Sequence, residues 1–175
     1  MADGPTYRVH FRRRRIGKTD YRYRLKLLKS GRPRAVVRIT NHRVIVSITE
    51  YDPRGDLVAA VADSQELPEL GFDDRSLTST TAAYLTGYLA GVRSLSAGKT
   101  SAVLDGGLTH PTPGGRILGA LKGLVDAGVE IPHSAEHFPS QERLEGKHLS
   151  QPPKAELATM VQKIKSAGTK ARGKK

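Results

Sequence analysis

The first half of the chain contains three short hydrophobic runs that are separated by turn-forming residues. These runs are AVVRIT (35–40), RVIVSITE (43–50) and DLVAAVA (56–62), and the first two are rich in β-branched residues. Asn41-His42 fits a tight turn between the first two runs, and Pro53-Arg54-Gly55 precedes the third. The pattern predicts a three-stranded meander.

A helical period replaces the strand pattern from Thr78 onwards. Hydroxyl residues at positions 76–81 can cap the first turn of a helix, and Gly98 can end it. The apolar positions that recur on one face are Leu85, Leu89, Val92 and Leu95. One amphipathic helix is therefore predicted after the three strands.

A second strand–helix unit follows. SAVLD (101–105) has the pattern of a short buried strand, and GGLTHPTPGG (106–115) that of a loop. A helix is predicted from Arg116 to Ala127, with Gly128 as its end and apolar positions at Ile117, Leu118, Leu121, Leu124 and Val125. The order βββαβα predicts an α/β sandwich, with helices packed on a mixed sheet.

The last forty residues are more polar. Past Pro132 the composition favours irregular structure, until Pro152-Pro153 opens a final helix. Its predicted buried face comprises Leu157, Met160, Val161 and Ile164. The tail SAGTKARGKK (166–175) has nothing to bury, so we expect it to be disordered until it meets a partner.

Charge divides the chain into three parts. Residues 1–34 carry twelve Lys and Arg against two Asp, and residues 150–175 carry seven against one Glu, which gives +10 and +6. The remaining ten basic and fourteen acidic residues give the middle part −4, and the three parts sum to the net charge of +12. We expect a basic, extended N-terminal arm (1–34), one α/β core domain (35–149), and a C-terminal helix with a basic tail (150–175).

The composition also excludes several classes of protein. The chain has no cysteine, which rules out disulfides and thiolate metal sites and fits a reducing cytoplasm. Its longest apolar stretch, Leu57 to Ala62, is far shorter than the ~20 residues of a membrane span, and the N-terminus lacks the apolar region of a signal peptide. A soluble protein without a signal peptide is expected.

The arm YRVHFRRRRIGKTDYRYRLKLLKSGRPR (7–34) is the strongest functional signal. It mixes arginine with Tyr7, Phe11, Tyr21 and Tyr23. Guanidinium groups pair with phosphate oxygens, and aromatic planes stack on exposed bases, so the mixture favours folded RNA. A membrane-binding helix would need an apolar face, which Arg12 to Arg15 lack, although leucines 25, 27 and 28 are expected to pack locally on the body. A solvated basic extension is the less favoured alternative.

Two other features suggest catalysis or ligand binding more weakly. The loop 106–115 precedes a helix, but it lacks the lysine and hydroxyl of GxxxxGK[ST], so a backbone connection is favoured over a nucleotide site. A candidate metal or acid–base set comprises His110, His133, His137 and His148 with Asp105 and Glu136, in spacings that match no recognised zinc motif. A nuclease or nucleotide hydrolase would need clustered carboxylates on its strands, and Asp105 stands alone.

Four long stretches resemble a known family. They are RRRRIGKTDYRYRLKLLKSGRPR with VVRITN (12–34 and 36–41), TAAYLTGYLAG (81–91), LDGGL (104–108) and LKGLVDAGVEIPHSAEHFPSQERLEGKHL (121–149). They resemble the universal L-eighteen family of large-subunit ribosomal proteins in its archaeal and eukaryotic form. The short C-terminal part, beside the longer extensions of eukaryotic members, favours an archaeal source.

The resemblance implies a fold and a function. The fold would be the ribonuclease H-like one of translation components, and the role a structural one in the ribosome, with no enzymatic activity, cofactor, metal, membrane contact or homo-oligomer. The implied partners are 5S rRNA, 23S rRNA, the separate universal L-five protein and other proteins of the central protuberance, in the cytoplasmic large subunit.

The resemblance and the arm chemistry together select the candidate RNA-binding residues. In the arm these are Arg8, Arg12, Arg13, Arg14, Arg15, Lys18, Tyr21, Arg22, Arg24, Lys26, Arg32 and Arg34. A second contact region comprises His133, Arg143, Lys147 and His148.

Overall fold

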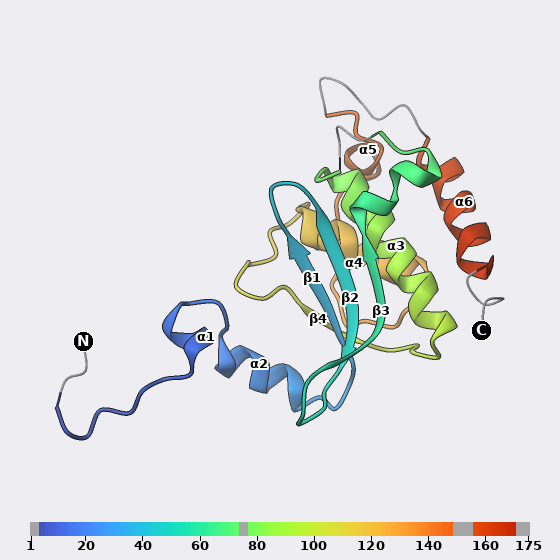
Figure 1. Cartoon of the computed structure of the whole chain (residues 1–175). Helices are drawn as coiled ribbons and strands as arrows, with labels where there is room; N and C mark the ends of the chain where they lie inside the picture. The colour runs from blue at the N-terminus through green and yellow to red at the C-terminus, as the bar shows by residue number, and fades with distance from the viewer. Residues whose placement is uncertain (1–3, 74–76, 149–155, 171–175) are drawn as a thin grey trace.

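A four-stranded mixed sheet forms one layer of the protein (Figure 1). The computed structural model describes residues 4–73, 77–148 and 156–170, with side chains up to 166 in the last segment. The strands are β1 (Arg34–Ile39), β2 (Val44–Glu50), β3 (Leu57–Asp63) and β4 (Val103–Asp105), in the spatial order β3-β2-β1-β4. The first three are antiparallel neighbours, as the meander prediction requires, and β4 runs parallel to β1. The mixed sheet and the order βββαβα are confirmed, whereas the named fold stays a prediction.

Strand alternation puts one set of side chains on the core face of the sheet. Ala35 and Val37 of β1 lie opposite Ile48 and Val46 of β2, and Val46 lies opposite Ala62 of β3. All five are at most 1% exposed. Because successive side chains in a strand point to opposite faces, the intervening residues occupy the other face. That second face keeps Val61 about half exposed, at 47%.

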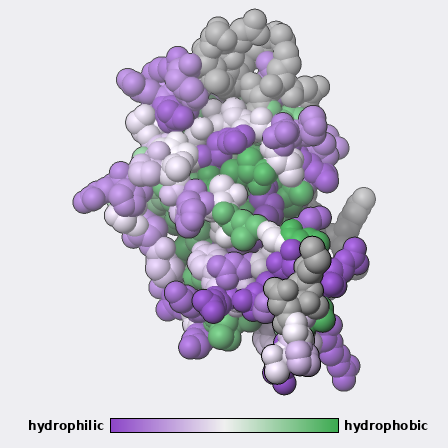
Figure 2. Space-filling view, turned by 90° about the vertical axis from the view of Figure 1, so that its left-hand side faces the viewer, coloured by the Kyte–Doolittle hydropathy of each residue, from purple (hydrophilic) through white to green (hydrophobic). Residues whose placement is uncertain are grey.

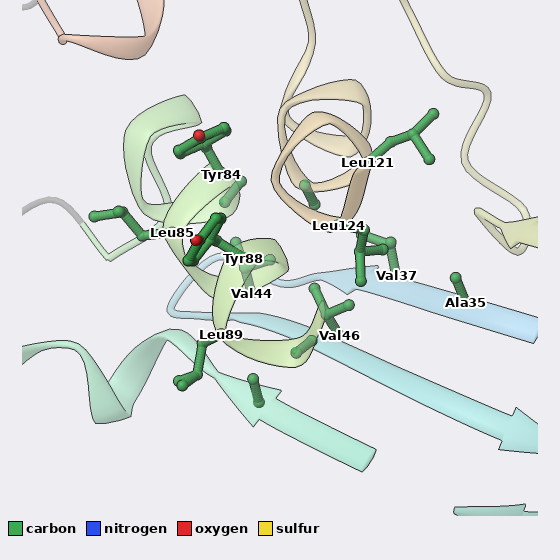
Figure 3. Packing of buried hydrophobic residues seen from close by; sticks show 14 of the residues in the cluster. Ala35, Val37, Val44, Val46, Tyr84, Leu85, Tyr88, Leu89, Leu121 and Leu124 are labelled. Atoms are coloured by element: carbon green, nitrogen blue, oxygen red, sulfur yellow. The ribbon is translucent and has the colours of Figure 1, made fainter. Parts of the chain in front are cut away.

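Two helices cover the core face. They are α3 (Thr80–Ser96), whose N-cap Ser79 accepts a hydrogen bond from Ala82 N–H, and α4 (Arg116–Asp126). Figure 3 shows leucines and tyrosines of α3 and leucines of α4 above the valines of the sheet. Every residue of α3 from Thr80 to Gly91 is buried, so the predicted amphipathic character of this helix is wrong. The helix lies between layers and has no solvent face over its first three turns.

The two helices approach each other through glycines. A Cβ placed on Gly87 would lie 2.1 Å from the carbonyl oxygen of Ala120, and one on Gly123 would lie 2.1 Å from that of Tyr84. Both distances are far below a van der Waals contact, so the missing side chains allow backbone to meet backbone.

The C-terminal helix α6 (Leu157–Lys170) covers the outer side of α3. Met160 and Ile164 are fully buried, and Leu157 and Val161 pack against the core, so the predicted apolar face is confirmed. The prolines expected to open this helix, Pro152-Pro153, lie outside the described residues. Of the expected disordered tail, residues 166–170 belong to α6, and 171–175 are not described.

The remaining described elements are short. They are the 3-10 turns η1 (Ser64–Glu66), η2 (Pro68–Leu70) and η4 (Ala135–His137) and the helices α1 (Arg12–Arg15), α2 (Tyr21–Leu28) and α5 (Gln141–Leu144). In Figure 1 the segment carrying α1 and α2 projects from the body at the lower left. The expectation of an extended N-terminal arm is therefore wrong for these two helical stretches.

Candidate RNA interface

The arm presents its arginines on a single helical turn. Helix α1 consists of Arg12 to Arg15 alone, and all four side chains are exposed. Gly17, with φ +65°, reverses the chain after this turn, and Arg13 Nε donates a hydrogen bond of 2.8 Å to Thr19 Oγ1. No ion pair joins these arginines to another described residue. Four guanidinium groups are therefore left to meet phosphates.

Helix α2 fastens the arm to the body. Its N-cap, Asp20, accepts hydrogen bonds from the backbone N–H groups of Arg22 and Tyr23 at 2.8 and 3.1 Å. Such a cap satisfies amides that the first turn leaves unpaired, and its charge complements the positive end of the helix. On the inner side Leu27 is buried and Leu28 is half-buried, as expected, whereas Leu25 is 57% exposed, which contradicts the expectation that it packs on the body.

A chain of alternating charges also joins the arm to the sheet. Arg24 of α2 donates to both carboxylate oxygens of Asp56 at 2.8 and 2.9 Å. Arg34 of β1 bridges Asp56 and Asp105, at 2.5 and 2.6 Å. Arg38 completes the network with a 3.2 Å contact to Asp105. Five charged residues, three cations and two anions, are thus paired in series; we call Arg24, Asp56, Arg34, Asp105 and Arg38 the arm–sheet network.

The structure places Arg34 apart from the other candidate RNA-binding residues. Its side chain is 4% exposed, and two carboxylates hold its guanidinium group. Its Nε is buried and has no hydrogen-bond partner among the described residues. Arg34 therefore belongs to the core of the arm–sheet network, and we remove it from the surface proposed below. Arg24 is half-buried, and its guanidinium group is likewise bound to a carboxylate, that of Asp56.

The other arm candidates lie on the surface. The exposed ones are Arg8, Arg12, Arg13, Arg14, Arg15, Lys18, Arg22, Lys26 and Arg32, and Tyr21 is half-buried beside Phe11, with ring centroids 5.5 Å apart. The arm also exposes the apolar residues Tyr7, Val9, Phe11, Ile16, Tyr23 and Leu25. Figure 2 shows this side of the molecule, where hydrophobic areas lie between hydrophilic ones. Charges and planar rings therefore occur together, as stacking on RNA bases requires.

The second candidate set lies at another end of the molecule. In Figure 1 helix α5, which carries Arg143, is at the top, far from α1 and α2. His133, Arg143, Lys147 and His148 are all exposed. The ring of His133 contacts the Ile131 carbonyl through Nδ1 at 2.7 Å, and Lys147 pairs with Glu145 at 2.8 Å. This ion pair raises the pKa of Lys147 and lowers that of Glu145.

The loop 106–115 lies between the two sets. At its start, Tyr23 of the arm reaches Leu104 O over 3.5 Å, and its hydroxyl also contacts the backbone of Gly106. Burial, followed by the charge of Asp105, raises the pKa of Tyr23. At its end, Gly114 N–H donates to His137 O at 3.0 Å, and Arg143 lies against Gly114. One loop therefore contacts both candidate regions.

The rival enzymatic interpretation concerned Asp105 and the histidines. Asp105 is buried and accepts hydrogen bonds from Arg34, Arg38 and Gly107 N–H, so its lone pairs already have partners. Within the described ranges, no three His, Asp or Glu side chains lie close enough to hold a metal ion. None of the described helices is both long and apolar enough to cross a membrane.

Sequence reasoning missed Arg38 and Asp56. Arg38 interrupts the apolar strand AVVRIT, and a lone charge in such a strand indicates that this face of the sheet is not fully buried. Asp56 has no comparable signal in the sequence, because it stands in a polar turn. It binds Arg34 and Arg24, which lie 22 and 32 positions away along the chain.

An α/β body with an exposed turn of arginines beside aromatic rings, where none of these arginines is ion-paired to another described residue, is typical of an RNA-binding protein. The model of the family described as ribosomal large subunit proteins 60S L5 and 50S L18 matches residues 5–102 and 96–134. The chain belongs to this family, as its resemblance to the L-eighteen proteins predicted.

Several archaeal relatives support the same conclusion. The large ribosomal subunit protein uL18 of Aeropyrum pernix is 51% identical over 152 residues, which cover 86% of this chain and 71% of that protein. The uL18 protein of Methanoculleus marisnigri is 47% identical over 167 residues, 94% of this chain and 95% of its own length. That of Methanospirillum hungatei is 48% identical and covers 86% of each chain. The expectation of an archaeal type agrees with these relatives.

Proposed function

We propose that this chain is a structural constituent of the large ribosomal subunit, in the cytoplasm, that binds 5S rRNA and helps attach it to 23S rRNA in the central protuberance. It acts there without catalysis, beside the universal L-five protein and other proteins of that region. The observation that carries the proposal is the exposed cluster of arm arginines, held on a body of the ribosomal family.

Charge distribution supports RNA as the partner of the arm. The arm has +10, the body −4 and the C-terminal part +6, so electrostatic attraction to phosphates is strongest at the arm. If ~6–10 phosphates are neutralised, affinity falls on the order of a thousandfold or more between low and moderate salt. The body surface is then left for protein neighbours, apart from the second set of His133, Arg143, Lys147 and His148, which we propose as a further RNA contact.

Helix α2 gives the arm a defined place, which supports a specific RNA over a generic polyanion. A free arm would lose conformational freedom on binding. Here Leu27 and the Arg24–Asp56 pair hold α2 before RNA arrives. The arginines of α1 therefore project from a fixed base.

A filter-binding titration with 5S rRNA and an unrelated structured RNA, at several salt concentrations, tests the proposal. One variant replaces Arg12 to Arg15 by alanine, which is a good helix former and should keep the exposed helical turn. The matched control replaces Lys170, Arg172, Lys174 and Lys175 by alanine. It removes the same number of positive charges, four, but from the C-terminal part of the chain. Truncation through residue 34 is unsuitable, because it removes the buried Leu27 and Arg34.

The arm variant should bind 5S rRNA more weakly, and the slope of log affinity against log salt should become shallower by roughly 3. The C-terminal control should change the slope less. Equal losses in both variants would mean that total charge alone decides binding, and equal affinity for the unrelated RNA would contradict the 5S proposal. In the same titration Arg143→Gln should reduce the slope by about 1 if the second set meets a phosphate.

A further inference from the structure

A cleft opens between the arm and the sheet edge. It encloses about 640 Å³, a volume within the usual range of ligand pockets. The arm contributes Arg13, Tyr21 and Tyr23 to its wall, β1 contributes Arg38, and the loop after β4 contributes Gly107 and Leu108. The Arg24–Asp56 ion pair and the buried Leu27 hold α2, which forms one wall of this cleft, against the body.

Arg38 forms a flat surface in this cleft. A Cβ on Gly107 would lie 2.9 Å from Arg38 Cζ and 3.1 and 3.2 Å from its two terminal nitrogens. These near-equal distances, with the central carbon nearest, place Gly107 over one face of the guanidinium plane. Arg38 Nη1 is also fixed by the carbonyls of Val37 and Asp105, at 2.9 and 2.8 Å. The side chain is nevertheless 45% exposed, so the plane is held rigidly and remains accessible.

Polar groups in the cleft are not all satisfied by the protein. The cleft contains five cations, Arg13, Lys18, Arg24, Arg34 and Arg38, against three carboxylates, Asp20, Asp56 and Asp105. The arm–sheet network neutralises the two inner carboxylates, and Asp20 caps α2, so Arg13 and Lys18 keep their charge for a ligand. Arg34 also lines the cleft, and its buried Nε has no hydrogen-bond partner in the part of the chain that the structure describes.

We infer that this cleft receives a single unstacked nucleotide of the bound RNA, with its base on the Arg38 plane and its phosphate near Arg13 and Lys18. Bases that leave a helical stack are held in proteins between aromatic rings and guanidinium planes. Tyr21 and Tyr23 supply the rings, and a volume of about 640 Å³ accommodates one nucleotide with room for its sugar. The inference rests on the proposed function and names the part of the RNA that this site recognises.

The arrangement fits a nucleotide within a chain better than a free nucleotide. The two cations left for a ligand, Arg13 and Lys18, both come from the arm that carries α1. A free nucleotide with several phosphates would need a denser anion site. A nucleotide flanked by phosphates on either side can instead place one near Arg13 and continue along the arginines of α1.

The test fills the cleft without changing its charge. Leu108→Trp is suitable because Leu108 is 58% exposed in a loop and lines the cleft. His110→Trp is the matched control, since His110 is exposed in the same loop and does not line this cleft. A second variant, Arg38→Lys, keeps the charge and removes the plane. The full chain and each variant are titrated with 5S rRNA at several salt concentrations, and the bases of all unpaired nucleotides in each complex are probed chemically.

The wild-type complex should protect at least one unpaired base that Leu108→Trp and Arg38→Lys leave reactive. Leu108→Trp should weaken binding about tenfold with an unchanged salt slope, because no phosphate contact is lost. His110→Trp should match the wild type within about twofold in the same titration. Thermal unfolding checks that each variant is folded.

Wild-type affinity and protections in Leu108→Trp would overturn the inference and leave the 5S proposal intact. A loss of affinity in Leu108→Trp without any change in base reactivity would also overturn the inference. The substitution would then weaken binding by altering the loop itself and not by filling a nucleotide site. If the wild type showed no preference for 5S rRNA, the proposed function would fail instead. The nucleotide-binding role of the cleft would then be tested by the same chemical probing of the complex with the unrelated RNA. The absence of a protected unpaired base in that complex would overturn the inference.

Discussion

Replacing Asp105 by asparagine should destabilise the protein strongly. Asp105 is buried on β4, and its side chain is 6% exposed where it meets the 4% exposed side chain of Arg34. Its Oδ2 accepts from Arg34, and its Oδ1 accepts from Arg38 and from Gly107 N–H at 2.9 Å. Asn keeps the shape but removes the charge, so Arg34 is left as a buried cation with one carboxylate.

The magnitude follows from this burial. Breaking a buried ion pair costs about 3–5 kcal/mol, chiefly because the remaining charge is desolvated without a partner. Arg34 retains Asp56, which favours the lower end, about 3 kcal/mol. For a chain of this size each kcal/mol shifts Tm by about 2–4 °C, so Asp105→Asn should lower Tm by roughly 6–12 °C.

Thermal unfolding followed by circular dichroism measures this shift. Glu145→Gln is the matched control, a carboxylate-to-amide change in a surface ion pair, and it should change Tm by less than about 2–4 °C. The double variant Arg34→Met with Asp105→Leu should recover most of the loss, since apolar side chains of similar size remove both buried charges. A Tm for Asp105→Asn within about 1 °C of wild type would refute this account of the network.

Two further changes test the packing and the pH dependence. Gly123→Ala should destabilise by ~3 kcal/mol, because its Cβ would meet the backbone of Tyr84 at 2.1 Å, whereas Gly119→Ala meets a Thr80 methyl at 3.1 Å and should be nearly neutral in urea unfolding. Equal stability of the two variants would contradict the backbone contact. Burial raises the pKa of Glu66, but hydrogen bonds from Arg93 and the Asp63 N–H lower it more, so its folded-state pKa is depressed. The ionised carboxylate therefore stabilises the fold above the unfolded pKa, and this stability is lost as pH falls through the folded pKa. Glu66→Gln should be less stable than wild type at pH 7, and the difference should shrink below about pH 4.3; urea midpoints that differ equally at pH 7 and pH 3 would contradict this.

Local signals predicted most of the secondary structure. The β-branched runs became β1 and β2, Ser79 caps α3, and Gly98 and Gly128 end their helices with φ of +76° and +104°. Each feature depends on neighbours within a few residues, which the sequence displays directly. The apolar face of α6 was equally readable, because Met160 and Ile164 recur at helical spacing.

Features that depend on distant residues were not predictable in the same way. The sequence of α3 does not show that α4 packs against its glycines. The helix was therefore predicted to keep a solvent-exposed face. In the arm, the run of like charges favoured an extended chain, although the Asp20 cap was a readable signal for α2. The burial of Arg34 depends on Asp56 and Asp105, which lie 22 and 71 positions away.

The arm–sheet network explains how one surface can serve both stability and recognition. Its carboxylates bind the inner guanidinium groups, Arg24 and Arg34, so those charges hold α2 against the sheet. The arginines of α1 form no ion pair with any described residue and keep their charge for phosphate. Because the same network fixes Arg38 beside the loop 106–115 and holds α2 on the sheet, loosening the network would change the position of the arm relative to the cleft. Weakening the network should therefore reduce selectivity for one RNA before it abolishes electrostatic affinity for RNA in general.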